Sequence, residues 1–287
     1  MTREDQRSPA GSIVIPAWNE AALIGTTLRA LFDGVDTDAF EVVVACNGCT
    51  DGTEAVVTAT GLPVTLLSLP PVGKHGAIVA AEQVATTLPR LYLDADIAVP
   101  GSSALATLRA MRDGAVAARP PLTYDTSGAA WLVRRYYAAR RRLRSVTTDL
   151  CGAGVYGLSE TARGRFDEFP AVVADDLFAA RIVSRDEVVI VDCPPAVVRT
   201  PRRARDLLRT LTRVYRGNAA LAATMPEAAS TASSTGRELL RVARDPRAII
   251  DVSVYVGFVL LARVVSRRAG DGWQRDDSSR ATVETSV

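Results

Sequence analysis

The sequence is poor in lysine, histidine and aromatic residues. Among its 287 residues, Lys74 is the single lysine and His75 the single histidine, although Lys and Arg together number 34. Asp and Glu number 32, so the formal net charge of +2 gives no indication of a nucleic-acid partner. The adjacent Lys74 and His75 therefore stand out in an arginine-rich chain, with chance as the simpler explanation.

Cysteine is also scarce, at four residues. Cys46 and Cys49 form a C-x-x-C, a spacing found in redox motifs and in half of some zinc sites. Because no second pair with this spacing exists, we interpret them as two small residues where a strand leads into a loop. Residues 1–12 are polar and contain no apolar segment of the secretory type, which predicts a cytoplasmic, reducing location without disulfides.

The first 120 residues alternate short β-rich runs with helical patterns. We expect strands over residues 11–15, 41–45, 63–68 and 90–93. Helices are expected over about 19–32, 50–60 and 75–88, with Asn19 capping the first and Thr50 or Asp51 capping the second. This alternation predicts an α/β fold, Rossmann-like, in which helices flank a mostly parallel central sheet.

The second half of the chain is rich in arginine and then carries an apolar run. Two Arg-rich helices are expected over about 131–144 and 202–223, followed by a loop over 227–236. Residues 252–262 are uncharged, and as a helix they are about 16 Å long, against about 30 Å for a bilayer core. A full membrane span is therefore not expected, and the segment 248–265 fits either an interfacial helix or a buried packing helix.

Two acidic residues directly after an apolar strand carry the strongest chemical signal. Asp94 and Asp96, separated by Ala95, follow the strand expected over 90–93. Two carboxylates at this spacing predict a site for Mn²⁺ or Mg²⁺, since these ions prefer oxygen ligands. Such an ion would neutralise charge on a departing nucleoside diphosphate.

Three further polar clusters follow the other strands, at the edge where open α/β sheets bind their ligands. They cover residues 15–20, 45–53 and 73–77. Asn47 offers an amide donor and an acceptor to a base edge, and Lys74 at a helix start can pair with a diphosphate. Taken singly, each cluster is equally consistent with an ordinary turn, a helix cap or a solvated lysine.

Taken in order, the four clusters resemble the motifs of the family 2 glycosyltransferases, which have the GT-A fold. The resemblance covers residues 11–185 and rests on an I-P-x-x-N-E start, an N-G-x-x-D-G-T loop, a G-K-x-x-A loop and the Asp-x-Asp. It implies that Asp96 and Asp94 bind the metal. Cys49 departs from the family pattern, in which serine is common at this place. The nucleotide-sugar site implied by the resemblance consists of Pro16, Ala17, Asn19, Glu20, Asn47, Asp51, Lys74, Asp94, Ala95 and Gly154.

The resemblance also implies a general base in the acidic pair Asp175 and Asp176. Asp176 aligns with the usual base of an inverting mechanism, and Asp175 is close enough in register to compete for this role. Two adjacent carboxylates can raise the pKa of one of them. The simpler explanation is the preference of helix N-termini for acidic residues. Residues 151–157 would form a loop on the acceptor side, where Gly154 lets the backbone approach the ligand.

The expected protein is a metal-dependent inverting glycosyltransferase with a C-terminal helical extension. Its expected parts are a disordered N-terminus (1–10), a nucleotide-sugar-binding half (11–120), an acceptor-binding half (121–225), a helical segment that contacts the membrane as one alternative (226–268) and a polar tail (269–287). The Gln-x-x-Arg-Trp motif of processive members is missing from the sequence, so transfer of a single sugar is expected.

The expected donor is a nucleotide-diphosphate sugar, and the expected acceptor is a carbohydrate or lipid-linked hydroxyl in cell-envelope polysaccharide, glycolipid or other glycoconjugate synthesis. The Arg-rich helices and the apolar run favour a peripheral position on the cytoplasmic face of the membrane. Two other functions stay open. One is a non-catalytic nucleotide-sugar-binding protein, and the other is a sugar nucleotidyltransferase, which would be expected to open with a Gly-rich phosphate loop.

Overall fold

The computed structural model describes residues 8–171, 174–224 and 232–268. The chain folds into two compact units, the first from Met1–Leu122 and Leu150–Val198, the second from Thr123–Asp149 and Arg199–Val287. The division differs from the contiguous halves expected from the sequence, because residues 150–198 fold with the first 122.

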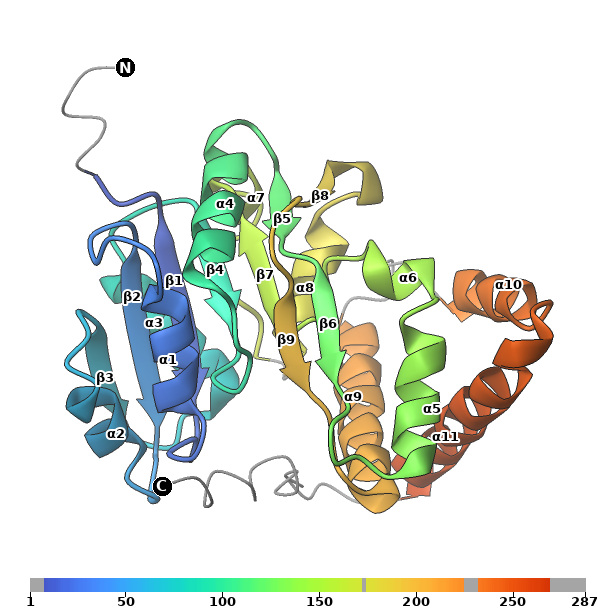
Figure 1. The fold of residues 1–287 in the computed structure, drawn as a ribbon. Helices are drawn as coiled ribbons and strands as arrows, with labels where there is room; N and C mark the ends of the chain where they lie inside the picture. Colours follow the sequence, from blue (N-terminus) through green and yellow to red (C-terminus); the bar gives the residue numbers. More distant parts are fainter. Residues whose placement is uncertain (1–7, 172–173, 225–231, 269–287) are drawn as a thin grey trace. The chain divides into compact units, whose positions relative to one another are not determined.

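The first unit is built on a seven-stranded sheet with the order β3-β2-β1-β4-β7-β5-β8 (Figure 1). Strand β1 pairs in parallel with β2 and β4, β2 with β3, and β5 with β8, whereas β7 runs antiparallel to β4 and β5. The expected mostly parallel sheet is thus confirmed. The strands are β1 Ser12–Ala17, β2 Glu41–Asn47, β3 Thr65–Leu69, β4 Arg90–Leu93, β5 Ala117–Arg119, β7 Val155–Leu158 and β8 Val188–Ile190.

Helices cover both faces of this sheet, with α1 and α4 in front of it and α3 behind it in Figure 1. The apolar run in β2 explains why: Val42 and Val44 face one core and Val43 the other, and all are buried, as in a central parallel strand. The helical elements of this unit are α1 Ile24–Phe32, α2 Thr53–Ala59, α3 Gly73–Val84, α4 Gly101–Arg112, α7 Glu160–Arg163, α8 Asp175–Ile182 and η1 Arg185–Glu187.

The first helix starts later than predicted. Asn19 has a left-handed backbone (φ 55°) and is not its N-cap; the carbonyl of Glu20 accepts the amides of Leu23 and Ile24 instead. The third helix ends earlier than predicted, at Val84. The amides of Thr86 and Thr87 donate to the carboxylate of Glu41 rather than continuing the helix.

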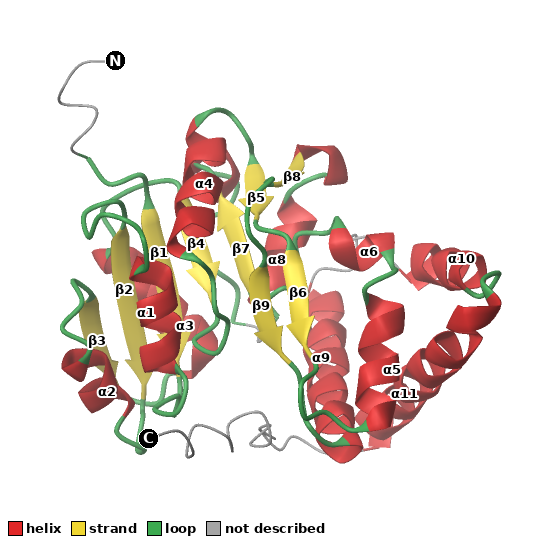
Figure 2. Ribbon diagram, viewed as in Figure 1, coloured by secondary structure: helices red, strands yellow, loops and turns green. Residues whose placement is uncertain are grey.

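The second unit is mostly helical, as the red ribbons of Figure 2 show. The chain passes between the units three times: within β6 (Leu122–Asp125), between residues 149 and 150, and within β9 (Ala196–Arg199). Strands β6 and β9 pair in a two-stranded sheet. The 227–236 loop prediction is wrong for residues 232–236, which begin a helix, while residues 227–231 lie outside the described part. The helical elements are α5 Trp131–Arg140, α6 Arg144–Thr147, α9 Ala204–Thr224, α10 Ala232–Val242, η2 Pro246–Ala248 and α11 Ile249–Arg268.

Helix α11 packs against α5 and α9 through aromatic and ionic contacts. The ring of Tyr136 stacks on Tyr255 at 4.9 Å, and Arg135 pairs with the buried Asp251 at 3.3 Å. The segment Pro246–Arg267 is long and apolar enough to cross a membrane by length and composition alone, with a mean hydropathy of 2.1, and only 22% of its most apolar window is buried.

The predicted disorder of residues 1–10 does not extend to Ala10. This residue is buried, and its amide donates to the carbonyl of Ala39 at 2.8 Å. Residues 1–7 and the predicted polar tail, 269–287, lie outside the described part of the chain.

Candidate active site

A small hollow lies where strands β1 and β4 of the first unit end. It brings together six of the residues expected from the sequence, and two tyrosines join them. Its lining consists of Pro16, Lys74, Tyr92, Leu93, Asp94, Gly154, Tyr156, Asp175 and Asp176.

Lys74 is the centre of this hollow. Its ammonium lies 2.8 Å from Oδ1 of Asp94 and 2.7 Å from Oδ1 of Asp175. Burial by itself lowers the pKa of Lys74, but the charges of Asp175 and Asp94 outweigh burial and raise it above its ordinary value. The single lysine of the chain is therefore held as a cation between two carboxylates.

The two adjacent acids of α8 differ in their surroundings. Asp175 is buried, and it accepts a hydrogen bond of 2.9 Å from the hydroxyl of Tyr156. Burial raises the pKa of Asp175, although the charge of Lys74 acts in the opposite direction. Asp176 is half-buried and accepts the backbone amides of Gly152 (2.7 Å) and Leu177 (2.8 Å). Both residues also occupy the first turn of α8, as the simpler helix-terminus explanation requires.

The turn after β4 fits closely against the loop before β7. The amide of Asp94 donates to the carbonyl of Gly154 at 2.8 Å. Gly154 has φ +65°, and a Cβ there would lie 2.6 Å from Cγ1 of Ile97 and 3.1 Å from Oδ2 of Asp94. Only glycine leaves this space beside the Asp94 carboxylate. Asp96 is half-buried in the same turn but does not line the hollow, and Ala95 is buried.

Two loops expected to contact the nucleotide are joined to each other by hydrogen bonds. Oδ1 of Asn19 accepts the amide of Thr50 at 2.7 Å, and Oδ2 of Asp51 accepts the amide of Ala21 at 3.0 Å. The amide of Glu20 donates to the hydroxyl of Thr53 at 2.8 Å. Oδ1 of Asp51 also accepts the amide of Thr53 at the start of α2. The expected cap by Thr50 or Asp51 is wrong, because the N-cap of α2 is Gly52, which has a left-handed backbone (φ 86°).

Of the other expected residues, Ala17 is buried at the end of β1, and Asn47 holds the loop that precedes α3. Oδ1 of Asn47 accepts the amides of Val72 (2.7 Å) and Gly73 (3.0 Å). Because Lys74 is the next residue along the chain, these two hydrogen bonds to Asn47 also position the backbone of the lysine. A contact of Asn47 with a base would depend on its amide donors, since its oxygen already accepts two hydrogen bonds.

Sequence reasoning missed the support behind Asp175. Tyr92 and Tyr156 are register partners on β4 and β7, and their rings stack at 4.8 Å. The hydroxyl of Tyr92 donates to Glu82, which also pairs with Arg90 and Arg163, both at 2.9 Å. Burial raises the pKa of Glu82, but hydrogen bonds, first that from Arg163, lower it overall. The pairing of two strands more than 60 residues apart leaves no local sequence signal.

The single histidine lies beside this support. Nε2 of His75 is 2.7 Å from the carbonyl oxygen of Phe169, so the histidine contacts backbone.

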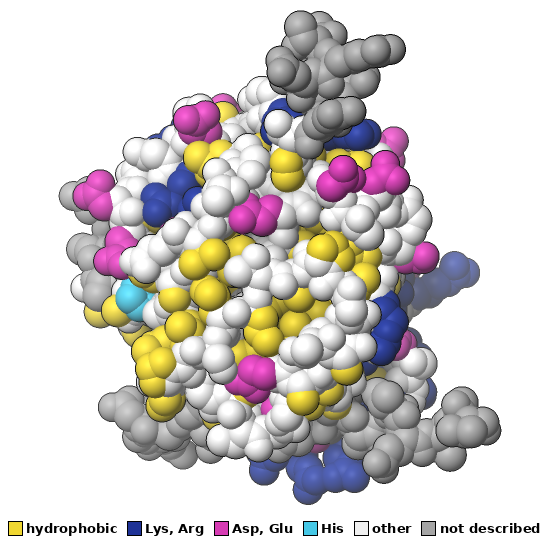
Figure 3. Space-filling model, turned by 90° about the vertical axis from the view of Figure 1, so that its left-hand side faces the viewer, with side chains coloured by type: hydrophobic (Ala, Val, Ile, Leu, Met, Phe, Trp, Pro, Cys, Tyr) yellow, Lys and Arg dark blue, Asp and Glu magenta, His cyan; other side chains and the backbone are white. Residues whose placement is uncertain are grey.

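Figure 3 shows the molecule from the side of strand β3, with hydrophobic side chains gathered toward the middle of the face and acidic groups scattered among them. Among the described residues visible there, Lys and Arg form no continuous basic surface.

The model of the family described as "Glycosyl transferase family 2" matches residues 12–167, more than half of the chain. Glycosyltransferase AglD of Haloferax volcanii is 29% identical over 163 residues, which cover 51% of this chain and 25% of that relative. The chain therefore matches only a quarter of the length of this relative.

Two solved structures share the fold. A mannosyltransferase of Pyrobaculum calidifontis, in complex with GDP-Man and Mn²⁺, is 20% identical with a TM-score of 0.59, over 92% of this chain and 76% of that one. Glucosyl-3-phosphoglycerate synthase of Mycobacterium tuberculosis, with Mn²⁺, UDP-glucose and glycerol 3-phosphate, is 20% identical with a TM-score of 0.53, over 77% and 80%. These likenesses confirm the predicted GT-A fold, and the match of the family model means that the chain belongs to the family 2 glycosyltransferases.

Proposed function

We propose that this glycosyltransferase moves one sugar from a nucleotide-diphosphate sugar to an acceptor hydroxyl, with inversion at the anomeric carbon. The observation that carries the proposal is the pairing of Lys74 with Asp94 and Asp175 in a hollow at the sheet edge. Three carboxylates and one ammonium meet there, and such an arrangement suits a diphosphate, a cation and a hydroxyl that must lose a proton.

Asp176 is the proposed general base. It is half-buried and accepts hydrogen bonds from two neutral backbone amides, so a carboxylate oxygen can accept the proton of an incoming hydroxyl. Asp175 is the proposed positioning residue, because Tyr156 and Lys74 hold it and the charge of Lys74 is thereby oriented toward the donor site.

Asp94 and Asp96 are the proposed ligands of Mn²⁺ or Mg²⁺. Carboxylate oxygens suit these hard ions, the side chain of Asp94 is 39% exposed, and Gly154 leaves space beside its Oδ2. When bound, the ion would supply positive charge to the leaving diphosphate. The complexes of the two similar enzymes with Mn²⁺ and GDP-Man or UDP-glucose support this class of ligands.

Thermal unfolding with UDP, GDP, TDP and CDP sugars, each with and without Mn²⁺, tests the donor site. A ligand at a hundredfold excess over its Kd raises stability by about 2.7 kcal/mol. We expect a Mn²⁺-dependent shift with one nucleotide in the wild type and none in Asp96→Ala. A retained Mn²⁺-dependent shift in Asp96→Ala would remove Asp96 from the metal site. Donor binding without any transfer or hydrolysis would favour the non-catalytic alternative, and consumption of a nucleoside triphosphate the nucleotidyltransferase.

We also propose that the second unit attaches to the cytoplasmic face of a membrane and that the acceptor is lipid-linked. Helix α11 exposes apolar side chains, and an open groove of about 220 Å³ lies beside α5. Arg263 and Arg267 near the end of α11 are exposed and suit anionic lipid headgroups. The groove is lined by Leu132, Val254, Gly257, Phe258 and Leu261.

A further inference from the structure

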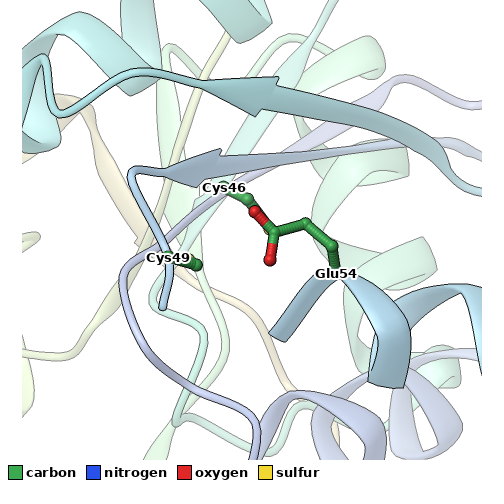
Figure 4. Close-up of side chains that lie close together, drawn as sticks. All are labelled: Cys46, Cys49 and Glu54. Carbon is green, nitrogen blue, oxygen red and sulfur yellow. The ribbon is translucent and has the colours of Figure 1, made fainter. Parts of the chain in front are cut away.

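We propose that Cys46, Cys49 and Glu54 bind a thiophilic divalent cation such as Zn²⁺. This site is separate from the acidic pair Asp94 and Asp96, and it does not depend on the proposed function. Among the described residues, these three form a group whose ligand atoms all lie within 4.8 Å of one another. Figure 4 shows the three side chains directed toward a common space between the end of β2 and the start of α2.

The chain brings these ligands together through a strand, a turn and a helix. Cys46 is on the core-facing side of β2 with Val42 and Val44, so its thiol points toward the helix layer. Cys49 follows in the loop, and Glu54 is the second residue of α2. The sequence alone showed half a zinc site because the third ligand is a glutamate in the first turn of α2, outside the C-x-x-C spacing.

Zinc is bound by cysteine thiolates and by carboxylate oxygens, usually with four ligands in tetrahedral geometry. Zn–S distances are about 2.3 Å and Zn–O distances about 2.0–2.2 Å, so three ligands of one ion lie within about 4 Å of each other. The present separations therefore need only a small contraction. Cys46 is fully buried, while Cys49 and Glu54 are half-buried, so an ion would enter past these two residues and keep a water as fourth ligand.

The local charges favour a cation. The carboxylates of Glu54 and Asp51 are near enough to Cys46 to act on it electrostatically, and both attract a cation. Binding of the ion by the two cysteines as thiolates would release the protons of their thiols, with no change of oxidation state.

The site is connected to the first loop of the candidate active site. The thiol of Cys49 lies 3.5 Å from the carbonyl oxygen of Ala17, to which it donates, and its sulfur accepts the amide of Asn19 at 3.3 Å. A thiolate bound to a metal has no proton to donate to Ala17. Occupancy of the site would therefore alter how this loop is held.

Cobalt titration of the reduced, full-length protein tests the proposal, because Co²⁺ bound by thiolates absorbs in a way that Co²⁺ bound by carboxylates does not. We expect thiolate-to-cobalt absorption that saturates at one ion per chain and disappears when Zn²⁺ is added. Cys49→Ser should abolish the absorption, and Glu54→Gln should weaken the affinity by roughly tenfold or more. Matched controls are Cys151→Ser and Cys193→Ser, which should leave the titration unchanged.

Cys46→Ser places a hydroxyl in the core and is a weaker test, because this variant can fail to fold. The decision therefore rests on Cys49→Ser and Glu54→Gln, with circular dichroism to verify their folding. The proposal is overturned if the wild type shows no thiolate absorption, if Cys193→Ser abolishes it, or if Asp96→Ala does. The proposal is also overturned if Cys46 and Cys49 of the wild type form a disulfide under reducing conditions and bind no Co²⁺.

Discussion

The sheet edge of the first unit and the helices of the second unit use charged residues in different ways. In the first unit one lysine, with a side chain 26% exposed, pairs with two carboxylates, of which Asp175 is only 6% exposed. In the second unit, Arg142 and Asp245 pair at 3.0 Å with both side chains more than 40% exposed. Solvent screens the second pair far more than the first. The candidate site thus contains the single lysine of the chain rather than one of its many arginines.

The largest expected effect is on turnover in Asp176→Asn. Loss of a general base lowers the rate by about 10²–10⁴-fold. We expect kcat to fall within this range while the donor-induced thermal shift is unchanged, since the asparagine can still accept the amide of Gly152. Steady-state kinetics with the donor found in the thermal panel measure the effect.

Asp175→Asn is the matched comparison for this variant. If turnover were unchanged in Asp176→Asn and lost in Asp175→Asn, the roles that we propose for the two carboxylates would be exchanged.

Removal of Lys74 should destabilise the first unit strongly. Lys74→Met leaves Asp175 buried without its ion partner, a change that costs about 3 kcal/mol or more. Urea unfolding should record this loss, and Lys74→Met combined with Asp175→Asn should recover part of it, because no buried carboxylate is then left unpaired. Equal destabilisation in the single and double variants would mean that the two side chains are not coupled.

The apolar surface of the second unit should control membrane attachment. Leu261 is 49% exposed and lines the groove, so Leu261→Glu adds a charge where we expect contact with lipid. Co-sedimentation with vesicles containing anionic lipid should show roughly a tenfold loss of binding, equivalent to about 1.4 kcal/mol. Val189→Glu, at a residue that is 40% exposed in the first unit, is the control. Wild-type protein that stays in the soluble fraction at low salt would end the membrane proposal.

The smallest effect is expected for the exposed pair. Arg142→Ala should change the free energy of unfolding by less than about 1 kcal/mol, because exposed ion pairs contribute little. Thermal unfolding at low and high salt measures it. A loss as large as that in Lys74→Met would remove the contrast between the two units.

Much of the fold could be predicted because apolar periodicity is a local signal. The strand Arg90–Leu93 has the bounds expected from the sequence, and the parallel order followed from helices between strands. The antiparallel β7 could not be predicted in this way, because its direction depends on pairing with β4 from a distant part of the chain. The start of α1 was misplaced because Asn19 bonds to another loop instead of to its own helix.

The site was predictable where residues follow a strand directly. Lys74 and Asp94 were chosen on this basis and Asp176 on the family resemblance, and the structure gathers all three at one hollow. The contributions of Tyr156 and Glu82 depend on tertiary contacts, and the composition of their local segments does not distinguish them from core residues.

The hydrogen bonds between the loop after β1 and the loop after β2 have a consequence for engineering. The side chain of Asn19 accepts a hydrogen bond from the amide of Thr50, and that of Asp51 accepts one from the amide of Ala21. Each loop therefore supplies a side chain that holds the backbone of the other. Transplanting one loop alone into a relative would leave both deformed. The two segments therefore form one structural unit, and a chimaera of two such enzymes should keep both loop conformations only when the segments are moved together.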